Sequence, residues 1–234
     1  LLTNALNNAD SVIAISAYIR KQLEALGVIP SKIINIPNGV DIESFQKQVS
    51  FDLRKRFGIP QDAIVILSVG NDRPAKAFDI GIKAFAQLHS KIANTYYVIL
   101  GAGTDRWLPL AHELGVAQNT IIYKGLYADE LIGAYQQSDI FFSPSLHEAC
   151  PLVVLEAMAA GLPEVVTNVS GSQDAIQPGI NGIVVEPGNI EEMANALLQL
   201  ACDKPLRNTM GAANIVKSES YDWNKISRMY LEHA

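Results

Sequence analysis

The sequence predicts an α/β fold, a Rossmann-like parallel sheet with helices on both faces. The run AIVILSVG (63–70) is nearly all apolar and ends in Gly, which is typical of a strand buried on both faces. The next segment, 77–92, has apolar residues at helical spacing. Because such strands and helices alternate along the chain, we expect a parallel sheet.

The alternation continues as far as residue 203. We expect strands at 96–103, 120–125, 139–145, 164–168 and 182–189, and helices at 105–116, 128–138, 151–161 and 190–203. Pro151 suits the first turn of its helix, where no backbone N–H is needed. Ligands of such sheets bind at the carboxyl ends of the strands, where the sequence places Gly70, Gly101, Gly103, Gly125, Ser143 and Ser145.

The first residues follow a different pattern. Two strand candidates, 11–16 and 32–37, flank a helix at 16–27, and Asn38-Gly39 then predicts a turn with positive φ angles. Two strands alone bury too little surface to be an independent domain. We therefore expect this segment to be the tail of a preceding domain, and the missing initiator Met favours a fragment.

Composition excludes several classes of protein. The chain has 234 residues and a net charge of −6, which disfavours nucleic-acid binding because phosphate backbones require an excess of Lys and Arg. No apolar run is long enough to span a membrane, and the first ten residues have neither the basic nor the apolar region of a secretory leader. Two cysteines, Cys150 and Cys202, are too few for a disulfide framework and indicate a reducing cytosol.

Two loops at strand ends carry polar residues. The loop 70–79 offers Arg73 and Lys76, which could bind an anion or simply be solvated surface cations. The loop GAGTD (101–105) lacks the third glycine of a dinucleotide fingerprint, because Arg106 stands there. We interpret it as a tight turn between a strand and a helix.

The stretch HEACPLVVLEAMAAGLP (147–163) places two acids, Glu148 and Glu156, beside an apolar helix. Buried carboxylates cost several kcal/mol unless something pairs with them. They could accept paired hydrogen bonds from the vicinal hydroxyls of a sugar, or they could be two unrelated solvated glutamates.

Taken with its flanking segments, this stretch resembles the Glu-x7-Glu signature of retaining glycosyltransferases with the GT-B fold, of the group 1 or family 4 type. That family includes glycogen-synthase-like enzymes and sugar transferases of lipopolysaccharide and phosphatidylinositol. The similar segments occur in the order of the family: ADSVIAIS, KIINIPNGVD, ILSVGNDRPAKAFDIGIKAF, YVILGAGTD, SDIFFSPSLHEACPLVVLEAMAAGLP and NGIVVEPGN.

The resemblance implies roles for individual residues. Glu148 would contact the donor sugar, Glu156 the nucleotide ribose and Lys76 the phosphates, while the loop from Tyr123 to Leu126 would frame the nucleobase. The implied catalytic residues are Lys76, Arg73 and Glu148. The implied donor-binding residues are Gly70, Lys76, Lys124, Glu148, Ala149, Cys150, Leu152, Val153 and Glu156. Neither a metal nor a cofactor is expected.

The sequence departs from the family at four positions. Asn71 replaces the Arg that usually follows the first-loop Gly, and Arg73 could substitute for it. Ala77 replaces a Gly, Glu164 stands where an apolar strand residue is expected, and Asp174 replaces a frequent Glu. The replacement of Arg by Asn71 weakens the prediction of catalytic turnover more than the prediction of donor binding.

The resemblance implies three segments. Residues 1–47 would be the remnant of an N-terminal acceptor domain with its linker, 48–218 a donor-binding domain that forms the C-terminal half of a GT-B fold, and 219–234 a C-terminal crossover helix. The expected reaction transfers a sugar from a UDP- or GDP-linked donor to an unidentified acceptor. The partners are the donor and a missing N-terminal acceptor domain or subunit, without nucleic acid. We expect a cytoplasmic protein, peripheral at most to the inner face of a membrane, and membrane contact only through the missing domain.

Three alternatives remain open on sequence grounds. A non-catalytic nucleotide or nucleotide-sugar module, as one subunit of a split transferase, is favoured by Asn71. An NAD-dependent oxidoreductase would leave Lys76, Glu148 and Glu156 unexplained, and a nucleotide-sugar epimerase would share the fold. His147 is interpreted as a surface residue or a neighbour of the site.

Overall fold

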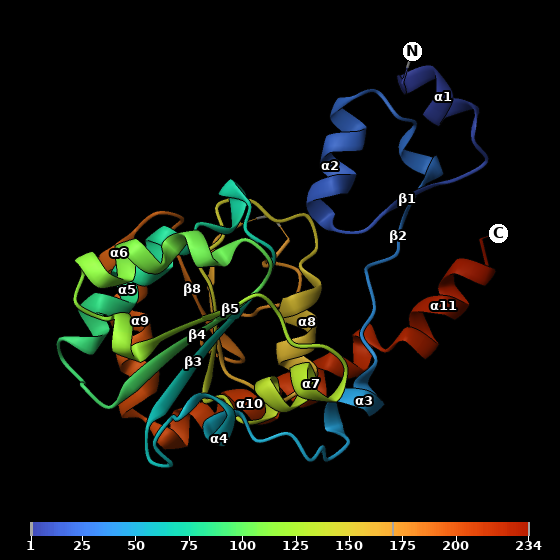
Figure 1. Ribbon diagram of the computed structural model, residues 1–234. Coiled ribbons are helices and arrows are strands. Elements are labelled where there is room, and N and C mark those ends of the chain that lie inside the picture. Colours follow the sequence, from blue (N-terminus) through green and yellow to red (C-terminus); the bar gives the residue numbers. More distant parts are fainter. Residues whose placement is uncertain (1, 170, 234) are drawn as a thin grey trace.

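The computed structural model describes residues 2–169 and 171–233 (Figure 1). Leu1 and Ala234, the outer limits of the predicted segments 1–47 and 219–234, lie outside these described residues. Within them a larger sheet has six parallel strands in the order β5-β4-β3-β6-β7-β8. The strands are β3 (Ile64–Val69), β4 (Thr95–Leu100), β5 (Thr120–Tyr123), β6 (Ile140–Ser143), β7 (Glu164–Thr167) and β8 (Gly182–Val185). The predicted parallel sheet is confirmed.

Helices cover both faces of the larger sheet (Figure 1). One face carries α5 (Phe78–His89), α6 (Leu108–Glu113) and α9 (Ile190–Cys202). The opposite face carries α4 (Leu53–Phe57), α7 (Asp129–Gln136) and α8 (Leu152–Ala159). Helix α10 (Lys204–Ser218) packs against both α8 and α9, with Met210 in the cluster of α5 and α9. This two-sided cover explains why the strands are nearly continuous apolar runs.

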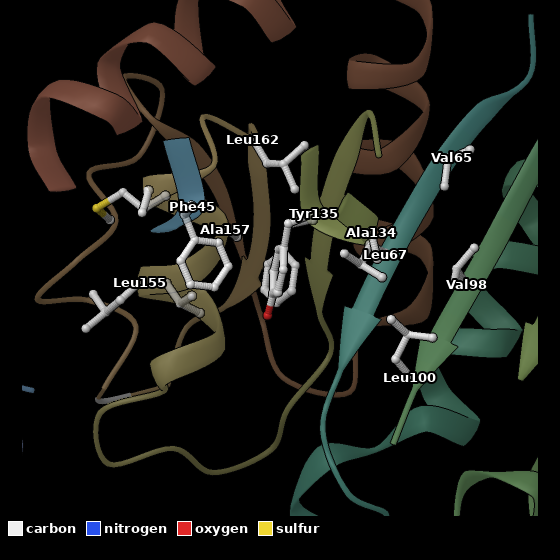
Figure 2. Packing of buried hydrophobic residues seen from close by; sticks show 14 of the residues in the cluster. Phe45, Val65, Leu67, Val98, Leu100, Ala134, Tyr135, Leu155, Ala157 and Leu162 are labelled. Atoms are coloured by element: carbon white, nitrogen blue, oxygen red, sulfur yellow. The ribbon is translucent and has the colours of Figure 1, made fainter. Parts of the chain in front are cut away.

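Successive strand residues enter two different cores. Val65 and Leu67 face the cluster shown in Figure 2, whereas Ile66 between them packs on the side of α5 and α9. The alternation follows from the period of two along a strand. The cluster in Figure 2 also contains Phe45 and Tyr135, whose rings meet edge to face with centroids 5.4 Å apart.

The backbone that follows helix α8 packs closely against helix α10. The helix ends at Ala159, and Gly161 follows with φ of 75°, a left-handed conformation that favours glycine. A Cβ at Gly211 of α10 would lie 2.2 Å from the carbonyl oxygen of Gly161, so α10 can approach the end of α8 only because residue 211 has no side chain.

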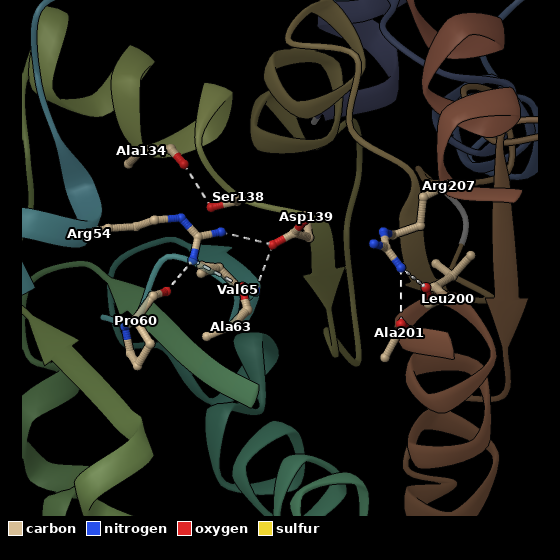
Figure 3. Close-up of polar contacts among 10 residues, drawn as sticks. All are labelled: Arg54, Pro60, Ala63, Val65, Ala134, Ser138, Asp139, Leu200, Ala201 and Arg207. Atoms are coloured by element: carbon tan, nitrogen blue, oxygen red, sulfur yellow. Dashed lines mark hydrogen bonds and ion pairs between the residues drawn. The ribbon is translucent and has the colours of Figure 1, made fainter. Parts of the chain in front are cut away.

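Polar anchors lie at the amino ends of the strands (Figure 3). The guanidinium of Arg54 donates to the carbonyls of Pro60 and Ala63 and to Asp139 Oδ2, at 2.8, 2.9 and 3.2 Å. Asp139 Oδ2 also accepts from the amide of Val65 at 2.9 Å, so it joins β3 to the start of β6. These bonds fix the edge of the sheet opposite to the strand ends where a ligand is expected.

A smaller lobe precedes the larger sheet. It contains α1 (Leu2–Asn8), β1 (Val12–Ala14), α2 (Ala17–Ala25) and β2 (Ile33–Asn35), and α3 (Ile42–Gln46) follows its linker. The C-terminal helix α11 (Trp223–Leu231) extends from the larger lobe on the side of the smaller one (Figure 1). The domain limits expected after residues 47 and 218 stay predictions.

Two local expectations are wrong. Gly39 has no positive φ; a Cβ there would instead lie 2.6 Å from Cδ2 of Trp223, so the glycine makes room for an indole ring. The helix expected at 105–116 is divided into a 3₁₀ helix, Thr104–Trp107, and α6, because Pro109 offers no N–H to a helix that begins earlier. The short helices α3 and α4 were not expected, although Asp41 and Asp52 cap them.

None of the helices in the described part of the chain has the length and apolarity that a membrane crossing requires.

Glu164 on β7 is the most unfavourable residue of the core. Its side chain is fully buried, and both carboxylate oxygens lack a hydrogen-bond partner among the described residues. Burial raises the pKa of Glu164 well above its usual value of 4.5. The folded protein therefore keeps a proton that the unfolded chain releases, and the free energy of unfolding falls as pH rises from about 4.5 toward the folded-state pKa.

We expect Glu164→Leu to raise the free energy of unfolding at pH 8 by about 1–3 kcal/mol, because it removes an unpaired buried polar group. Urea denaturation at pH 5 and pH 8 measures this gain, which should be smaller at pH 5. The exposed Glu113→Leu is the matched control and should change stability by less than about 0.5 kcal/mol. An equal gain at both pH values would show that ionisation of Glu164 does not destabilise the fold.

Candidate functional site

The loops after β3 and β6 meet at the carboxyl edge of the larger sheet. The amide of Leu146 donates to the carbonyl of Ala75 at 2.7 Å, which ties the two loops together. Beside this bond, Lys76 Nζ lies 2.6 Å from Glu148 Oε1. Both side chains are mostly buried, with 20% of Lys76 and 13% of Glu148 exposed, so the ion pair is partly desolvated and ordered.

Glu148 is held from a second side by serine. Ser145 Oγ donates to the same Oε1 at 2.8 Å, and the carbonyl of Ser145 accepts from the hydroxyl of Thr167 on β7. The carbonyl of Glu148 accepts from the amide of Gly171 at 3.1 Å. A Cβ at Gly171 would lie 2.5 Å from the carbonyl carbon of Ala149, so glycine allows this loop to pack against the backbone directly after Glu148.

The backbone around Lys76 is adapted to its position. A Cβ at Gly70 would lie 3.0 Å from Cε of Lys76, so the glycine leaves room for the lysine side chain. Lys76 ends the 3₁₀ helix Pro74–Lys76, and Ala77 follows with φ of 49°. A non-glycine residue in this left-handed region costs about 1–2 kcal/mol. The Gly that the family has at this position would avoid that cost.

A cleft of about 570 Å³ opens in front of the ion pair. Four residues predicted for the site line it, namely Arg73, Lys76, Glu148 and Ala149. Two cations against one carboxylate give this cleft a positive balance, which suits an anionic ligand. The size lies within the usual range for ligand sites.

Sequence reasoning had assigned no site role to several other lining residues. These are Tyr18, Ala75, Leu146, Asn168, Val169 and Pro187, and His147 also lines the cleft. Tyr18 comes from the smaller lobe, and no spacing rule relates it to the strand ends. Asn168 directly follows β7, so the rule that ligands bind at strand ends could have identified it.

A second cavity, of about 110 Å³, lies beside the end of β4. Gly70 and Lys124 line it, together with Leu126 and Tyr127. The loop GAGTD turns here as expected, with Gly103 at φ of 78°. A Cβ at Gly101 would lie 1.8 Å from the carbonyl oxygen of Gly70, so the ends of β3 and β4 converge at this point.

Glu156 lines neither of these two cavities. Its Oε2 accepts a hydrogen bond from Tyr135 OH at 2.6 Å. Burial raises the pKa of Glu156, while the Tyr135 hydroxyl and the charge of Lys76 act against that shift. Oε1 of Glu156, like Oε2 of Glu148, has no protein partner among the described residues. Each acid thus has one oxygen that a ligand hydroxyl could approach.

The remaining predicted residues surround the start of α8. The carbonyl of Cys150 accepts from Asn38 Nδ2 at 3.1 Å, and burial raises the pKa of the Cys150 thiol. Leu152 is 46% exposed, whereas Val153 packs against the core. None of the three lines either cavity, and their contact with a donor stays a prediction.

Asn71 lines the second cavity and not the larger cleft. Its Oδ1 accepts from the amide of Ala102 at 3.1 Å, so it joins the loops after β3 and β4. Arg73, two residues later, lines the cleft beside Lys76. In the described part of the chain, no group of three or more His, Cys, Asp or Glu side chains is placed to hold a metal ion.

Comparison with known proteins identifies the family. The family described as glycosyl transferases group 1 matches residues 49–216, which is more than half of the chain, and the glycosyltransferase family 4 description matches residues 1–44. This chain belongs to the glycosyl transferases group 1.

This group 1 chain is similar to two bacterial enzymes named D-inositol 3-phosphate glycosyltransferase. It is 32% identical to that of Stackebrandtia nassauensis in an alignment that covers 83% of this chain and 46% of that protein. It is 30% identical to that of Kribbella flavida in an alignment that covers 95% of this chain and 55% of that protein. The chain therefore spans about half the length of these relatives.

Solved structures share the fold of this group 1 chain. A structure of Anabaena Alr3699/HepE in complex with UDP and glucose superposes with a TM-score of 0.88 at 24% identity, covering 99% of this chain and 65% of that one. Sucrose-phosphate synthase from Thermosynechococcus elongatus gives a TM-score of 0.85 at 22% identity, covering 99% of this chain and 59% of that one. The expected GT-B-type fold is confirmed.

We expect Tyr135→Phe to lower the free energy of unfolding at pH 8 by about 1–3 kcal/mol, because it leaves the buried carboxylate of Glu156 without its donor. The lost bond favours the charged acid, so its loss raises the pKa of Glu156 further. The cost is then smaller at pH 4, where Glu156 is protonated. Urea denaturation at both pH values measures it.

Tyr127→Phe is the matched control, because Tyr127 is 76% exposed and its hydroxyl donates no hydrogen bond to a buried carboxylate among the described residues. A loss for Tyr135→Phe that is equal at pH 4 and pH 8 would contradict the role of the charged carboxylate.

Proposed function

We propose that this chain binds the nucleotide-diphosphate sugar of a retaining sugar transfer and forms the donor half of the enzyme. The observation that carries the proposal is the ion pair of Lys76 and Glu148, which faces a positively balanced cleft beside Arg73. In this proposal the second cavity, lined by Gly70 and Lys124, would take the nucleobase, and Gly70 lies next to the side chain of Lys76. Membership of the group 1 family supports the assignment.

The charges suit the leaving group of such a reaction. Lys76 has three N–H donors and spends one on Glu148, so two remain for phosphate oxygens. As the glycosidic bond breaks, negative charge grows on the diphosphate, and preorganised cations stabilise it by about 2.7–4 kcal/mol per contact. Arg73 would supply the second cation, taking over from the arginine that Asn71 replaces.

Glu148 would then bind the transferred sugar. Its Oε1 is occupied by Lys76 and Ser145, which leaves Oε2 to accept from a sugar hydroxyl. Glu156 would use Oε1 for a ribose hydroxyl while Tyr135 holds Oε2. Ala149, Cys150, Leu152 and Val153 would contribute backbone contacts to the donor.

The comparisons suggest the chemistry of both substrates. The Anabaena structure that shares the fold contains UDP and glucose, which favours a UDP-linked donor here. The similar curated enzymes are named for inositol 3-phosphate, which favours a phosphorylated polyol as acceptor. The acceptor would be held mainly by an N-terminal domain or subunit, since this chain spans about half the length of those relatives.

A non-catalytic donor-binding module is the second candidate. It is favoured by Asn71, which bonds the amide of Ala102 and carries no charge toward the diphosphate. This candidate shares the binding site and differs only in turnover. Release of free sugar from UDP-glucose, measured with Arg73→Ala as comparison, distinguishes the two, because only an active site should lose rate when Arg73 is removed.

We expect calorimetric titration of the chain with UDP, GDP, ADP and their sugar conjugates to show selective binding of one nucleotide. Lys76→Ala should weaken that binding by at least about tenfold, because a charge-assisted hydrogen bond contributes about 1.5–3 kcal/mol. Glu156→Ala should weaken it as well, and equally for the nucleotide and its sugar conjugate.

Lys83→Ala is the matched control, since Lys83 is a half-exposed cation on α5 that pairs with Asp79 and lines neither cavity. If Lys83→Ala and Lys76→Ala weaken binding equally, the effect is one of net charge and the site is misplaced. Absence of binding to every nucleotide would contradict the proposed function.

A further inference from the structure

Tyr18 reaches the cleft from the smaller lobe. It lies in the first turn of α2 and lines the same cleft as Lys76 and Glu148, although these belong to the larger lobe. Its side chain has 40% of its surface exposed, which is high for an aromatic residue. An aromatic ring at the rim of a polar cleft offers a flat apolar face and a hydroxyl, which suits the C–H face and hydroxyls of a sugar.

The first turn of α2 is attached to the larger lobe by one charged hydrogen bond. Asp174 Oδ2 accepts from the backbone amide of Ala17 at 2.7 Å. Ala17 directly precedes Tyr18, and it is the first residue of the helix, so its amide has no partner within α2. The carboxylate also interacts favourably with the positive end of the helix. Figure 1 shows this end of α2 beside the larger lobe.

A cavity lies between the two lobes beside this hydrogen bond. It has a volume of about 220 Å³ and is lined by Ser16 and Ala17 on one side and by Asp174 and Tyr221 on the other. Ser16 itself is used within the helix, where its Oγ accepts from the amide of Ile19 at 3.2 Å. Asp174 is therefore well placed to set where the first turn of α2, and with it Tyr18, lies over the cleft.

Asp174 is in turn fixed by the C-terminal segment. Its carbonyl accepts from Tyr221 OH at 2.8 Å, and the carbonyl of Tyr221 accepts from the amide of Val40 in the linker at 2.8 Å. The position of Asp174 thus depends on the larger lobe, the linker and the C-terminal segment together.

We propose that Tyr18 contacts the transferred sugar and contributes to donor specificity, and that Asp174 is a positioning residue that holds Tyr18 over the cleft through the first turn of α2. The inference rests on the proposed function, because it requires that the cleft bind a nucleotide sugar. It assigns to the smaller lobe a part in sugar recognition that is separate from nucleotide binding.

The test compares the affinity of UDP with that of UDP-glucose, and of GDP with that of GDP-mannose, by calorimetry on the chain and its variants. Tyr18→Ala should weaken binding of the sugar conjugate by about fivefold or more while the nucleotide alone binds as before, because only the sugar reaches the ring. Tyr18→Phe keeps the ring and should retain affinity for the sugar conjugate.

Asp174→Ala should reproduce the selective loss, whereas Asp174→Asn should retain most of the affinity, because an amide oxygen can still accept from Ala17. Lys21→Ala, an exposed change on the same helix, is the control for general effects on α2 and should alter neither affinity. Urea denaturation of each variant confirms that the fold is intact.

The outcomes are distinguishable. If the unmodified chain binds no nucleotide, the proposed function is overturned and this inference with it. If it binds the sugar conjugates and Tyr18→Ala changes their affinity no more than that of the nucleotide, the role of Tyr18 is overturned while the donor site stands. If Tyr18→Ala weakens binding of the sugar conjugate selectively and Asp174→Ala does not, the positioning role of Asp174 is overturned, while Tyr18 still contacts the sugar.

Discussion

The ion pair of Lys76 and Glu148 is the interaction on which the site depends. It joins the loops after β3 and β6, two adjacent strands of the larger sheet, at the edge where all carboxyl ends meet. Neither charge could be buried alone without a cost of several kcal/mol. Each neutralises the other, and Ser145 adds a further donor to the acid. The pair therefore makes both charged groups compatible with a core that is otherwise apolar.

The second buried acid, Glu156, also has a hydrogen-bond donor, whereas the third, Glu164, has none among the described residues. Glu156 is held by Tyr135, which stands in the apolar cluster of Figure 2. Burial of Tyr135 raises the pKa of its hydroxyl well above the usual value, and the nearby acids Glu156 and Glu164 raise it further. Glu148 and Glu156 thus each have a hydrogen-bond donor, and Glu148 also lines the larger cleft, whereas Glu164 has no hydrogen-bond partner among the described residues.

Two residues weaken the fold, one at the site and one at the opposite edge of the sheet. Ala77 adopts a left-handed conformation directly after Lys76, whereas Glu164 lies unpaired at the first residue of β7, among the amino ends of the strands. Natural proteins retain such conflicts mainly where function requires particular residues. For Ala77 the requirement is the direction of the chain after the lysine; the structure gives no corresponding reason for Glu164. At the amino ends of the strands, Arg54 and Asp139 show no such conflict, because their groups are mutually satisfied (Figure 3).

The sequence by itself determined the parallel sheet, the order of its elements and the loops that carry Arg73, Lys76 and Glu148, because the periodicity of apolar residues and the rule of strand ends are local properties. It did not determine that Tyr135 would satisfy Glu156, that Trp223 would require Gly39, or that Asp174 would accept from the amide next to Tyr18. These contacts join residues far apart in the chain, and they arise only when the strands and both lobes are assembled. Spacing along a sequence predicts neighbours within one element, whereas packing between elements decides which side chains face a shared cavity.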